Sequence, residues 1–439
     1  MNTLGGKFAV ALACLAGGLA CAGNALAQSA APAANPEGSG LRFNGFGTIG
    51  LTHTAGPEGL GFRRDISQPP NDGGTRGDID SRLGLQLNYA ASPRLEFVGQ
   101  VLLKRRVDIS PPIDSLEWAF AAYRPNSEWT IRVGRTNPDS FLLSDYRNVG
   151  FAYPWVRPEV GFYGALPLYS LDGADITHSW SLGSARWKLK LFAGQGAAYG
   201  VQSSAVPPVK VDARSISGLN LSREADGLTL RATVSHMRLA LTRAESLQRL
   251  SDALQLVQGL PEPEVAAQAR TLQRGLSLQP GELTFVEFGV SYEGRDWLLS
   301  GEVSNIGGSF AASHGTAGYA SVGRRFGGVT LFGVLAASRS SGADAVPPGW
   351  AARLAPVLGP ALAQQLQQIG NGAAAAVNAP RQRQQSLSLG MRWDIDDRMA
   401  LKLQWDHYRI SAHGGRLWSN PSPEAMRTNV GSLVLDFVF

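Results

Sequence analysis

The chain has 439 residues, a formal net charge of +5 and a mean hydropathy of -0.08, with 52 glycines. Basic residues are scattered among acidic ones rather than massed, so the composition gives no support for nucleic-acid binding. After the N-terminus, no apolar run approaches the roughly 20 residues of a membrane-spanning helix, which argues against a helical membrane protein.

The N-terminus has the three parts of a secretory signal peptide. Lys7 supplies a short positive region, residues 8–23 are apolar and small, and the Ala-Leu-Ala sequence that ends at Ala27 fits a cleavage site. We therefore predict a signal peptide over residues 1–27. The mature protein is expected to begin at Gln28.

Cleavage at this site has two consequences for the mature chain. Cys14 and Cys21 both lie in the removed segment, so the mature protein is expected to lack thiols, disulfides and thiolate metal sites. Residues 28–40 are small, polar and proline-containing, and are predicted to form a flexible lead. A membrane-anchoring helix and a lipid anchor at Cys21 are the alternatives, but the apolar run is short and the leucine typical of a lipobox is missing.

From residue 41 to the C-terminus, apolar and polar residues alternate with period two. Leu41 and Phe43 alternate with Arg42 and Asn44, for example, as in a strand with one lipid-facing and one water-facing side. Sixteen such strands are predicted, at residues 41–52, 79–89, 95–104, 115–124, 128–135, 173–181, 185–196, 211–222, 228–240, 283–293, 296–304, 315–325, 328–339, 385–394, 398–410 and 428–439.

The connections between these strands are short and long in turn. Seven are short turns, at residues 90–93, 125–127, 182–184, 224–227, 294–295, 326–327 and 395–397. An even strand number with short periplasmic turns and long extracellular loops is typical of an outer-membrane β-barrel. A soluble propeller or sandwich predicts no such asymmetry. The fold class is therefore all-β, a transmembrane antiparallel barrel over residues 41–439.

Tryptophan positions support this orientation, because amphipathic rings collect at membrane interfaces. One group lies beside the predicted short turns, on the apolar face of its strands: Trp129, Trp180, Trp187, Trp297 and Trp393. Trp118 and Trp405 lie six or seven residues from their turns and are predicted to mark the opposite interface.

Two of the long loops, at residues 241–282 and 341–383, contain helical patterns. Residues 243–276 and 350–369 carry Leu, Val and Ala at three- and four-residue spacing beside Arg and Gln. We expect these amphipathic segments to fold over the barrel mouth and pack on neighbouring loops. Docking of a partner on their apolar faces is the alternative.

Patterns for catalysis and metal binding are poorly supported. The six histidines are not arranged in an H-E-x-x-H motif or at close ligand spacing, and the chain lacks a G-x-S-x-G motif. No catalytic residue, metal site or cofactor is predicted. An active site assembled on the barrel rim from distant residues stays open as a minor alternative.

The polar faces of the strands assign charged residues to the lumen, and the candidates for lining a pore are Arg42, Arg82, Lys104, Glu117 and Arg132. Over all strands, ten basic and eight acidic residues are predicted to point inward: Arg42, Arg82, Lys104, Arg132, Lys188, Lys190, Arg214, Arg231, Arg392 and Lys402, with Asp80, Glu96, Glu117, Asp212, Glu287, Glu302, Asp406 and Asp436. A lumen lined by both signs holds water and sorts solutes by charge.

The third long loop, residues 136–171, is the most distinctive internal segment. It contains eight aromatic residues and five charged candidates for a constriction: Asp139, Asp145, Arg147, Arg157 and Glu159. The aromatic residues are expected to anchor the loop against the barrel wall, with a sugar-binding strip as the alternative.

The last eleven residues form an amphipathic strand that ends on an aromatic residue, Phe439. Together with the N-terminal strand pair, the Gly134-Arg135 pair that ends the fifth strand, and the long loop that follows it, this ending resembles the Gram-negative porins. The resemblance covers essentially the whole mature chain. The Pro-Glu-Phe-Gly-Gly segment of the general porins is absent here.

The resemblance implies a barrel of sixteen strands that assembles as a homotrimer and is inserted in the outer membrane by the barrel assembly machinery, which reads Phe439. It also implies a third loop that folds inward, with its acids facing wall arginines. We expect the pore to be narrowest between this loop and Arg42, Arg82 and Arg132, with a weak preference for anions.

The function that follows is passive diffusion of small hydrophilic solutes and ions through a water-filled channel. The alternatives are a selective channel for anions such as organic acids and, from another class, a barrel enzyme or adhesin that uses the long loops.

Overall fold

The computed structural model describes residues 40–439 except residues 108–113, 165–169, 201–207, 277 and 311–313. The predicted signal peptide and nearly all of the predicted flexible lead lie outside the described residues. Within them, seventeen strands form one antiparallel sheet.

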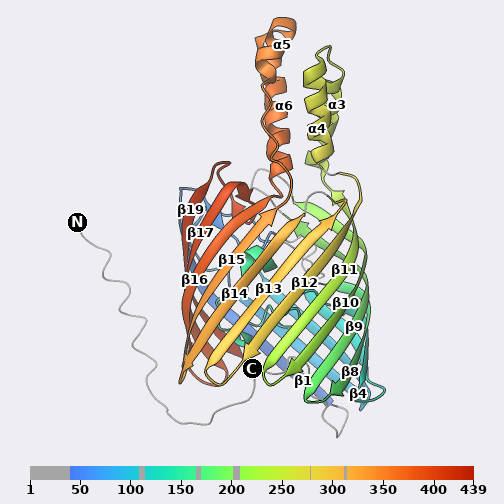
Figure 1. Cartoon of the computed structure of the whole chain (residues 1–439), viewed down its shortest axis with the longest axis vertical. Coiled ribbons are helices and arrows are strands. Elements are labelled where there is room, and N and C mark those ends of the chain that lie inside the picture. The colour runs from blue at the N-terminus through green and yellow to red at the C-terminus, as the bar shows by residue number, and fades with distance from the viewer. Residues whose placement is uncertain (1–39, 108–113, 165–169, 201–207, 277, 311–313) are drawn as a thin grey trace, which may run out of the picture. The chain divides into compact units, whose positions relative to one another are not determined.

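Sixteen long strands and the short β3 (Gly74–Arg76) make up this sheet, which closes into a barrel (Figure 1). The long strands are β1 (Gly40–Ala55), β4 (Arg82–Ser92), β5 (Leu95–Lys104), β6 (Leu116–Tyr123), β7 (Trp129–Thr136), β8 (Leu171–Leu182), β9 (Ala185–Gly200), β10 (Val209–Ala225), β11 (Leu228–Arg243), β12 (Gly281–Glu293), β13 (Trp297–Gly308), β14 (Gly315–Phe326), β15 (Val329–Ser340), β16 (Gln382–Asp394), β17 (Met399–Gly415) and β19 (Met426–Val438). All seven predicted short turns are confirmed.

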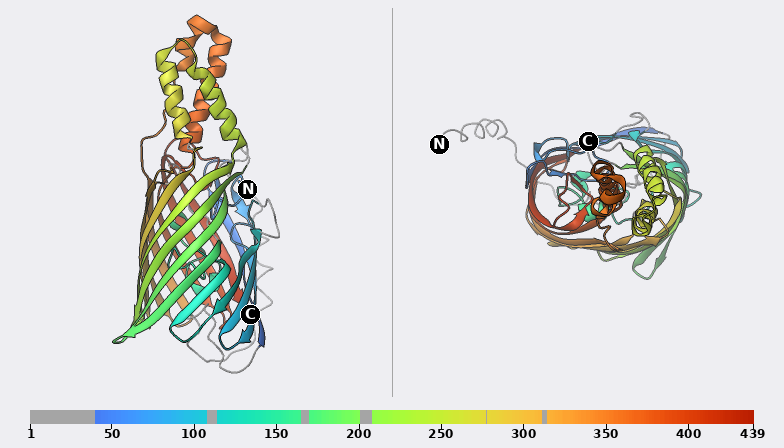
Figure 2. Two further views of the ribbon diagram at one scale, coloured as in Figure 1. Left: turned by 90° about the vertical axis from the view of Figure 1, so that its right-hand side faces the viewer. Right: turned by 90° about the horizontal axis from the view of Figure 1, so that it is seen from above.

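The first and last long strands close the barrel. β1 pairs with β4 along residues 40–48 and with β19 along residues 46–55, and the view from above shows the wall as a ring (Figure 2). At the seam, the N–H of Phe439 donates to the carbonyl of Gly45 at 2.9 Å, and the N–H of Gly45 donates back at 2.8 Å. Closure pairs the backbone groups that a bilayer would otherwise leave unsatisfied.

Glycine in β1 makes room for the aromatic residues of the last strand. A Cβ atom at Gly45 would lie 2.2 Å from the ring of Phe439, and one at Gly47 would lie 2.3 Å from the ring of Phe437. These two rings stack on the outer face with centroids 6.3 Å apart. The predicted apolar outer face of the last strand is confirmed, while Ser432 and Asp436 face inward and are buried.

The outer face carries the predicted aromatic residues beside the turns. Trp297 and Trp393 are exposed on this face, and Trp180 stacks on Trp187 across the β8–β9 hairpin. Trp405 is also exposed on the outer face. The prediction for Trp118 was wrong, because it lies directly opposite the inward-facing Gln100 and points into the barrel.

Two irregularities explain the errors in assigning faces. In β6 the register shifts at Glu117, which places Trp118 on the inner face. In β10 the pairing shifts between Ala213 and Ser215, so Arg214 is left out of the register. Ala213 packs in the inner core cluster, and Asp212 therefore lies on the other face. The inward assignments of Asp212 and Arg214 were wrong.

The second long strand begins three residues later than predicted. Ile79 and Asp80 precede β4 and belong to the loop that follows β1. Ile79 is buried in a cluster with two short strands of the loop region, β2 (Gly61–Phe62) and β18 (Trp418–Ser419), which pair with each other. These residues cover the loop end of the barrel interior instead of facing lipid.

Both predicted helical loops are confirmed as helical hairpins. α3 (Glu245–Gln258) and α4 (Pro263–Gly275) connect β11 with β12, and α5 (Trp350–Leu358) and α6 (Pro360–Asn378) connect β15 with β16 (Figure 1). Their apolar faces share one core, and the indole N–H of Trp350 donates to Gln268 at 2.8 Å. Among the described helices, none has the length and hydropathy needed to cross a bilayer.

The contacts at the seam predict that the last residue, Phe439, is important for assembly of the barrel. Deleting Phe439 removes two hydrogen bonds to Gly45 and apolar contacts worth about 2 to 3 kcal/mol, so we expect less assembled barrel in the membrane. The level of heat-modifiable protein on unheated gels measures this. Phe439→Tyr, which keeps the ring and the backbone, serves as the control and should assemble normally. Equal membrane levels of the deletion variant and the wild type would contradict the prediction.

Candidate functional site

The segment between β7 and β8 is here called loop 3 (residues 137–170), and its described residues 137–164 fold into the barrel (Figure 1). Its aromatic residues pack on inward-facing aromatic residues of the wall, with ring centroids 5.4 Å apart for Phe141 and Phe285 and 5.5 Å apart for Phe162 and Tyr319. The indole of Trp155 donates to the hydroxyl of Ser321 at 2.8 Å. The loop aromatic residues thus anchor it to β12 and β14, as the sequence predicted.

Arg157 forms the most deeply buried ionic contact between loop 3 and the wall region. Its guanidinium pairs with Asp80 at 2.6 Å and with Asp406 on β17 at 3.0 Å, and it donates to the hydroxyl of Ser432. Burial alone would raise the pKa of Asp80, but the charge and hydrogen bonds of Arg157 lower that pKa to about 2. This cation therefore holds two carboxylates that would otherwise be buried with only neutral hydrogen-bond donors, from Thr52 and Gln404.

Asp139 makes a second ionic contact on the opposite side of loop 3. Its carboxylate pairs with Arg231 on β11 at 2.5 Å and with Lys190 on β9 at 2.7 Å. Burial would raise the pKa of Asp139, but these two cations hold it well below its usual range. Loop 3 is thus fastened to the wall at both ends by opposite charges.

Wall cations also bind the loop through its backbone. The ammonium of Lys402 on β17 donates to the carbonyls of Gly150, Tyr153 and Trp155 at 2.6 to 2.8 Å and pairs with Asp436 at 2.8 Å. These three carbonyls lie around the one-turn helix η1 (Gly150–Ala152). A lysine inside the barrel therefore shapes the loop directly.

Two wall arginines add to this backbone contact. Arg82 donates to the carbonyl of Asn148 at 2.6 Å and to the Tyr153 hydroxyl at 3.1 Å. Arg392 on β16 donates to the carbonyls of Phe151 and Tyr153. Sequence parity identified Arg392 and Lys402 as inward, but backbone carbonyls carry no sequence signal, so their role in holding the loop was missed.

Arg147 and Glu159, the other two charged candidates in the buried part of loop 3, have structural contacts. The Arg147 carbonyl accepts from the Tyr153 hydroxyl at 3.0 Å, and its side chain is buried. Glu159 caps the short helix α2 (Val160–Tyr163), accepting from the N–H of Phe162 at 2.7 Å. Burial raises the pKa of Glu159 to about 7, although hydrogen bonds from the α2 backbone and Ser386 act against this shift.

Asp145 is the exposed acid of loop 3 and lies on a different side. It accepts from the amide of Asn137 at 2.9 Å. Together with Asp139, it is one of the loop carboxylates that act electrostatically on Arg132 of β7. Arg132 pairs with Asp175 on β8 at 2.8 Å and lies over the ring of Phe120. The loop acid that pairs directly with a wall arginine is Asp139, with Arg231, whereas the pairing of Asp145 with Arg132 stays a prediction.

The other predicted pore-lining residues lie in local ion pairs. Arg42 pairs with Glu96 at 3.1 Å near the turn end of β1. Lys104 pairs with Asp65 at 3.7 Å, and Glu117 with Arg106 at 3.5 Å, all with little exposed side-chain surface. Of the three arginines predicted at the constriction, only Arg82 donates a hydrogen bond to loop 3 among the described residues, and the constriction role of all three stays a prediction.

Metal-binding chemistry gains no support within the described part of the chain, where no three His, Cys, Asp or Glu residues are grouped to hold an ion. The strand histidines His178, His236 and His407 share a face with exposed apolar residues, outside the lumen. His178 stacks between Trp129 and Trp180.

This architecture is similar to that of solved bacterial outer-membrane proteins. No family model matches the sequence, and no curated protein matches it significantly. The outer membrane channel DcaP of Acinetobacter baumannii aligns over 92% of this chain and 98% of its own, with a TM-score of 0.52 and 11% identity. OmpF of Salmonella typhi aligns over 91% and 97%, with a TM-score of 0.50 and 11% identity. The chain has the porin fold. The closed sixteen-stranded barrel of this fold is the one the sequence predicted.

The buried ionic contact of loop 3 predicts a position sensitive to substitution. Arg157→Met leaves Asp80 and Asp406 buried without their cation, at a cost of about 3 to 5 kcal/mol, so loop 3 should detach from the wall of the porin barrel. Cleavage of residues 137–170 by added protease measures this. Arg325→Met, which breaks an exposed pair with Glu293, is the matched control and should change little. Equal protection of loop 3 in both variants would refute the role of Arg157.

The raised pKa of Glu159 predicts that docking of loop 3 on the barrel wall depends on pH. Because its folded-state pKa is raised from 4.5 to about 7, the protonated form favours the docked loop. This contribution is complete below about pH 4.5 and is lost as the pH rises through 7. We expect faster proteolysis of loop 3 at pH 8 than at pH 5, and Glu159→Gln should abolish the difference. A wild-type loop with the same protection at both pH values would contradict this.

Proposed function

We propose that this protein is a channel in the outer membrane of a Gram-negative bacterium, through which small hydrophilic solutes and ions diffuse passively. The observation that carries the proposal is the one-sided packing of loop 3. The loop is fastened to the wall from β9 through β19 to β4, while its exposed acid, Asp145, faces the side that carries Arg132. A sixteen-stranded barrel is too wide for wall side chains alone to fill.

The proposed passage runs between loop 3 and the inner face of β5 to β8. This face carries Gln100, Trp118, Phe120 and the Arg132–Asp175 pair. Charges of both signs at a narrow point keep water in the passage and act on permeating ions. Outer-membrane lipid surrounds the barrel, and insertion by the barrel assembly machinery through Phe439 and assembly as a homotrimer belong to the same proposal.

A selective channel for organic anions is the second candidate, and a specific observation favours it. Arg132 lies 5.2 Å from the centroid of the Phe120 ring, and Trp118 lies beside Phe120 with ring centroids 6.3 Å apart. A cation beside two inward-facing aromatic rings suits a flat, negatively charged solute. Conductance that saturates or is blocked by aromatic carboxylates would favour this candidate, whereas linear conductance favours general diffusion.

Ion selectivity tests the proposed passage. A unit charge about 8 Å from an ion is worth roughly 0.5 kcal/mol in water, so each substitution should change the anion-to-cation permeability ratio about twofold. We expect Asp145→Asn to shift the reversal potential toward anions and Arg132→Ser to shift it toward cations, in planar bilayers under a salt gradient.

Asp252→Asn, an exposed position on α3, is the matched control and should leave the reversal potential unchanged. A purified protein that gives no conductance would refute the channel. Conductance without a shift in either variant would place the selective point elsewhere along the barrel.

A further inference from the structure

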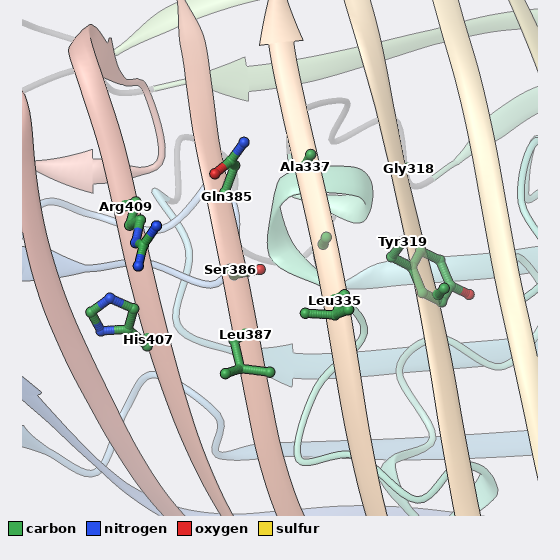
Figure 3. Close-up of a pocket in the computed structure, with 11 residues that line it drawn as sticks. Gly318, Tyr319, Leu335, Ala337, Gln385, Ser386, Leu387, His407 and Arg409 are labelled. Carbon is green, nitrogen blue, oxygen red and sulfur yellow. The ribbon is translucent and has the colours of Figure 1, made fainter.

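A groove of about 510 Å³ lies on the outer face of the barrel, across β14 to β17 (Figure 3). The strand register orders its lining in two adjacent rows. One row runs Ala320, Leu335, Leu387 and His407, and the next row toward the loops runs Gly318, Ala337, Gln385 and Arg409.

Small residues create the hollow in a face that is otherwise covered by large apolar side chains. Gly318, Ala320 and Ala337 lie on the outer face between β14 and β15. Leu335, of which 62% is exposed, and Leu387 stand beside them. The result is an apolar depression with the width of about three strands, open to the acyl phase of a membrane.

One end of the groove is positively charged. Arg409 on β17 is exposed and lies directly opposite Arg427 on β19, which is also exposed. Like charges directly opposite each other destabilise a sheet. Among the described residues, neither arginine makes an ion pair, so an anion placed between them would relieve the repulsion.

His407 extends this charged end toward the apolar part. His407 precedes Arg409 by two residues on β17 and therefore lies closer to the membrane centre. Its ring stacks on Trp405 with ring centroids 6.0 Å apart and shares a hydrogen bond of 2.9 Å with the amide oxygen of Asn429. Its ring therefore has a fixed orientation beside the groove. Arg339, exposed above Ala337 on β15, adds a further cation on the same face.

Along the membrane normal, the charged end of the groove lies at the level of the headgroup region of the outer leaflet. Eight residues of β16 separate Gln385 from Trp393, which lies at the turn end. Eight residues of a tilted strand rise roughly 20 Å, close to the height of about 25 Å of the apolar belt of such barrels. Arg409, opposite Gln385, is thus near the outer edge of the belt.

We propose that this groove binds a phosphorylated, acylated glycolipid of the outer leaflet, of the lipid A type. One acyl chain lies over Gly318, Ala320 and Ala337 between the two leucines, and a phosphate lies between Arg409 and Arg427. The proposal rests on the outer-membrane location proposed above and not on what passes through the barrel. A second copy of this chain is the alternative occupant, and the experiment below distinguishes the two.

The test measures lipid binding to the purified full-length protein in detergent, by native mass spectrometry. The probes are bisphosphorylated lipid A, the same lipid after removal of its phosphates, and inorganic phosphate. The variants are Arg409→Ala with Arg427→Ala, and Ala337→Leu, which fills the groove. Arg238→Ala, an exposed arginine on the outer face of β11, is the matched control.

We expect the double arginine variant to lose about a hundredfold in affinity for lipid A, because it removes two charge-assisted contacts, each worth about a factor of ten. Ala337→Leu should lower the affinity for both lipids and leave the binding of inorganic phosphate unchanged. Arg238→Ala should bind like the wild type.

Unchanged lipid A binding in the double variant would overturn the proposal. Loss of the oligomer in Ala337→Leu without a change in lipid binding would also overturn it, since the groove would then be an interface between copies. A wild type that binds phosphate as tightly as lipid A would exclude the acyl chain from the site. Because binding is measured in detergent, a protein without channel activity leaves this result interpretable.

Discussion

The requirement that every backbone polar group be paired inside a bilayer governs this structure. It is met at the seam, where β1 divides its length between β4 and β19 and the last residue of the chain bonds to Gly45. Once the sheet is closed, each strand has one face toward lipid and one toward the lumen. The aromatic belt, the inward charges and the position of loop 3 all follow from this division.

Inside the barrel, loop 3 is held by charges that would be costly if left alone. Arg157 satisfies Asp80 and Asp406, and Lys402 satisfies both Asp436 and the loop carbonyls. Such buried pairs contribute little net stability compared with apolar packing, but they fix one geometry because each group needs its partner. The width of the proposed passage therefore depends on residues that never face it.

The regular parts of the molecule could be predicted from the sequence, and the irregular parts could not. Period-two alternation and turn residues located the sixteen strands, since both depend on local sequence. The bulges at Glu117 and Arg214 were not predicted, because one extra residue moves the following side chains to the other face of the sheet without a clear local signal. The partners of the charged residues of loop 3 were not predicted either, since they join residues far apart in the sequence, 77 positions for Arg157 and Asp80 and 249 for Arg157 and Asp406.

This distinction matters most for ion selectivity. A count of inward residues, ten basic against eight acidic, gives equal weight to every charge. In the folded barrel most of these charges neutralise each other within a few ångströms, as Arg231 and Lys190 do with Asp139. Pairs at such distances act on a passing ion mainly as dipoles, whose field falls off faster than that of a single charge. The field in the passage is therefore set by exposed groups such as Asp145, and its sign follows from loop packing rather than from composition.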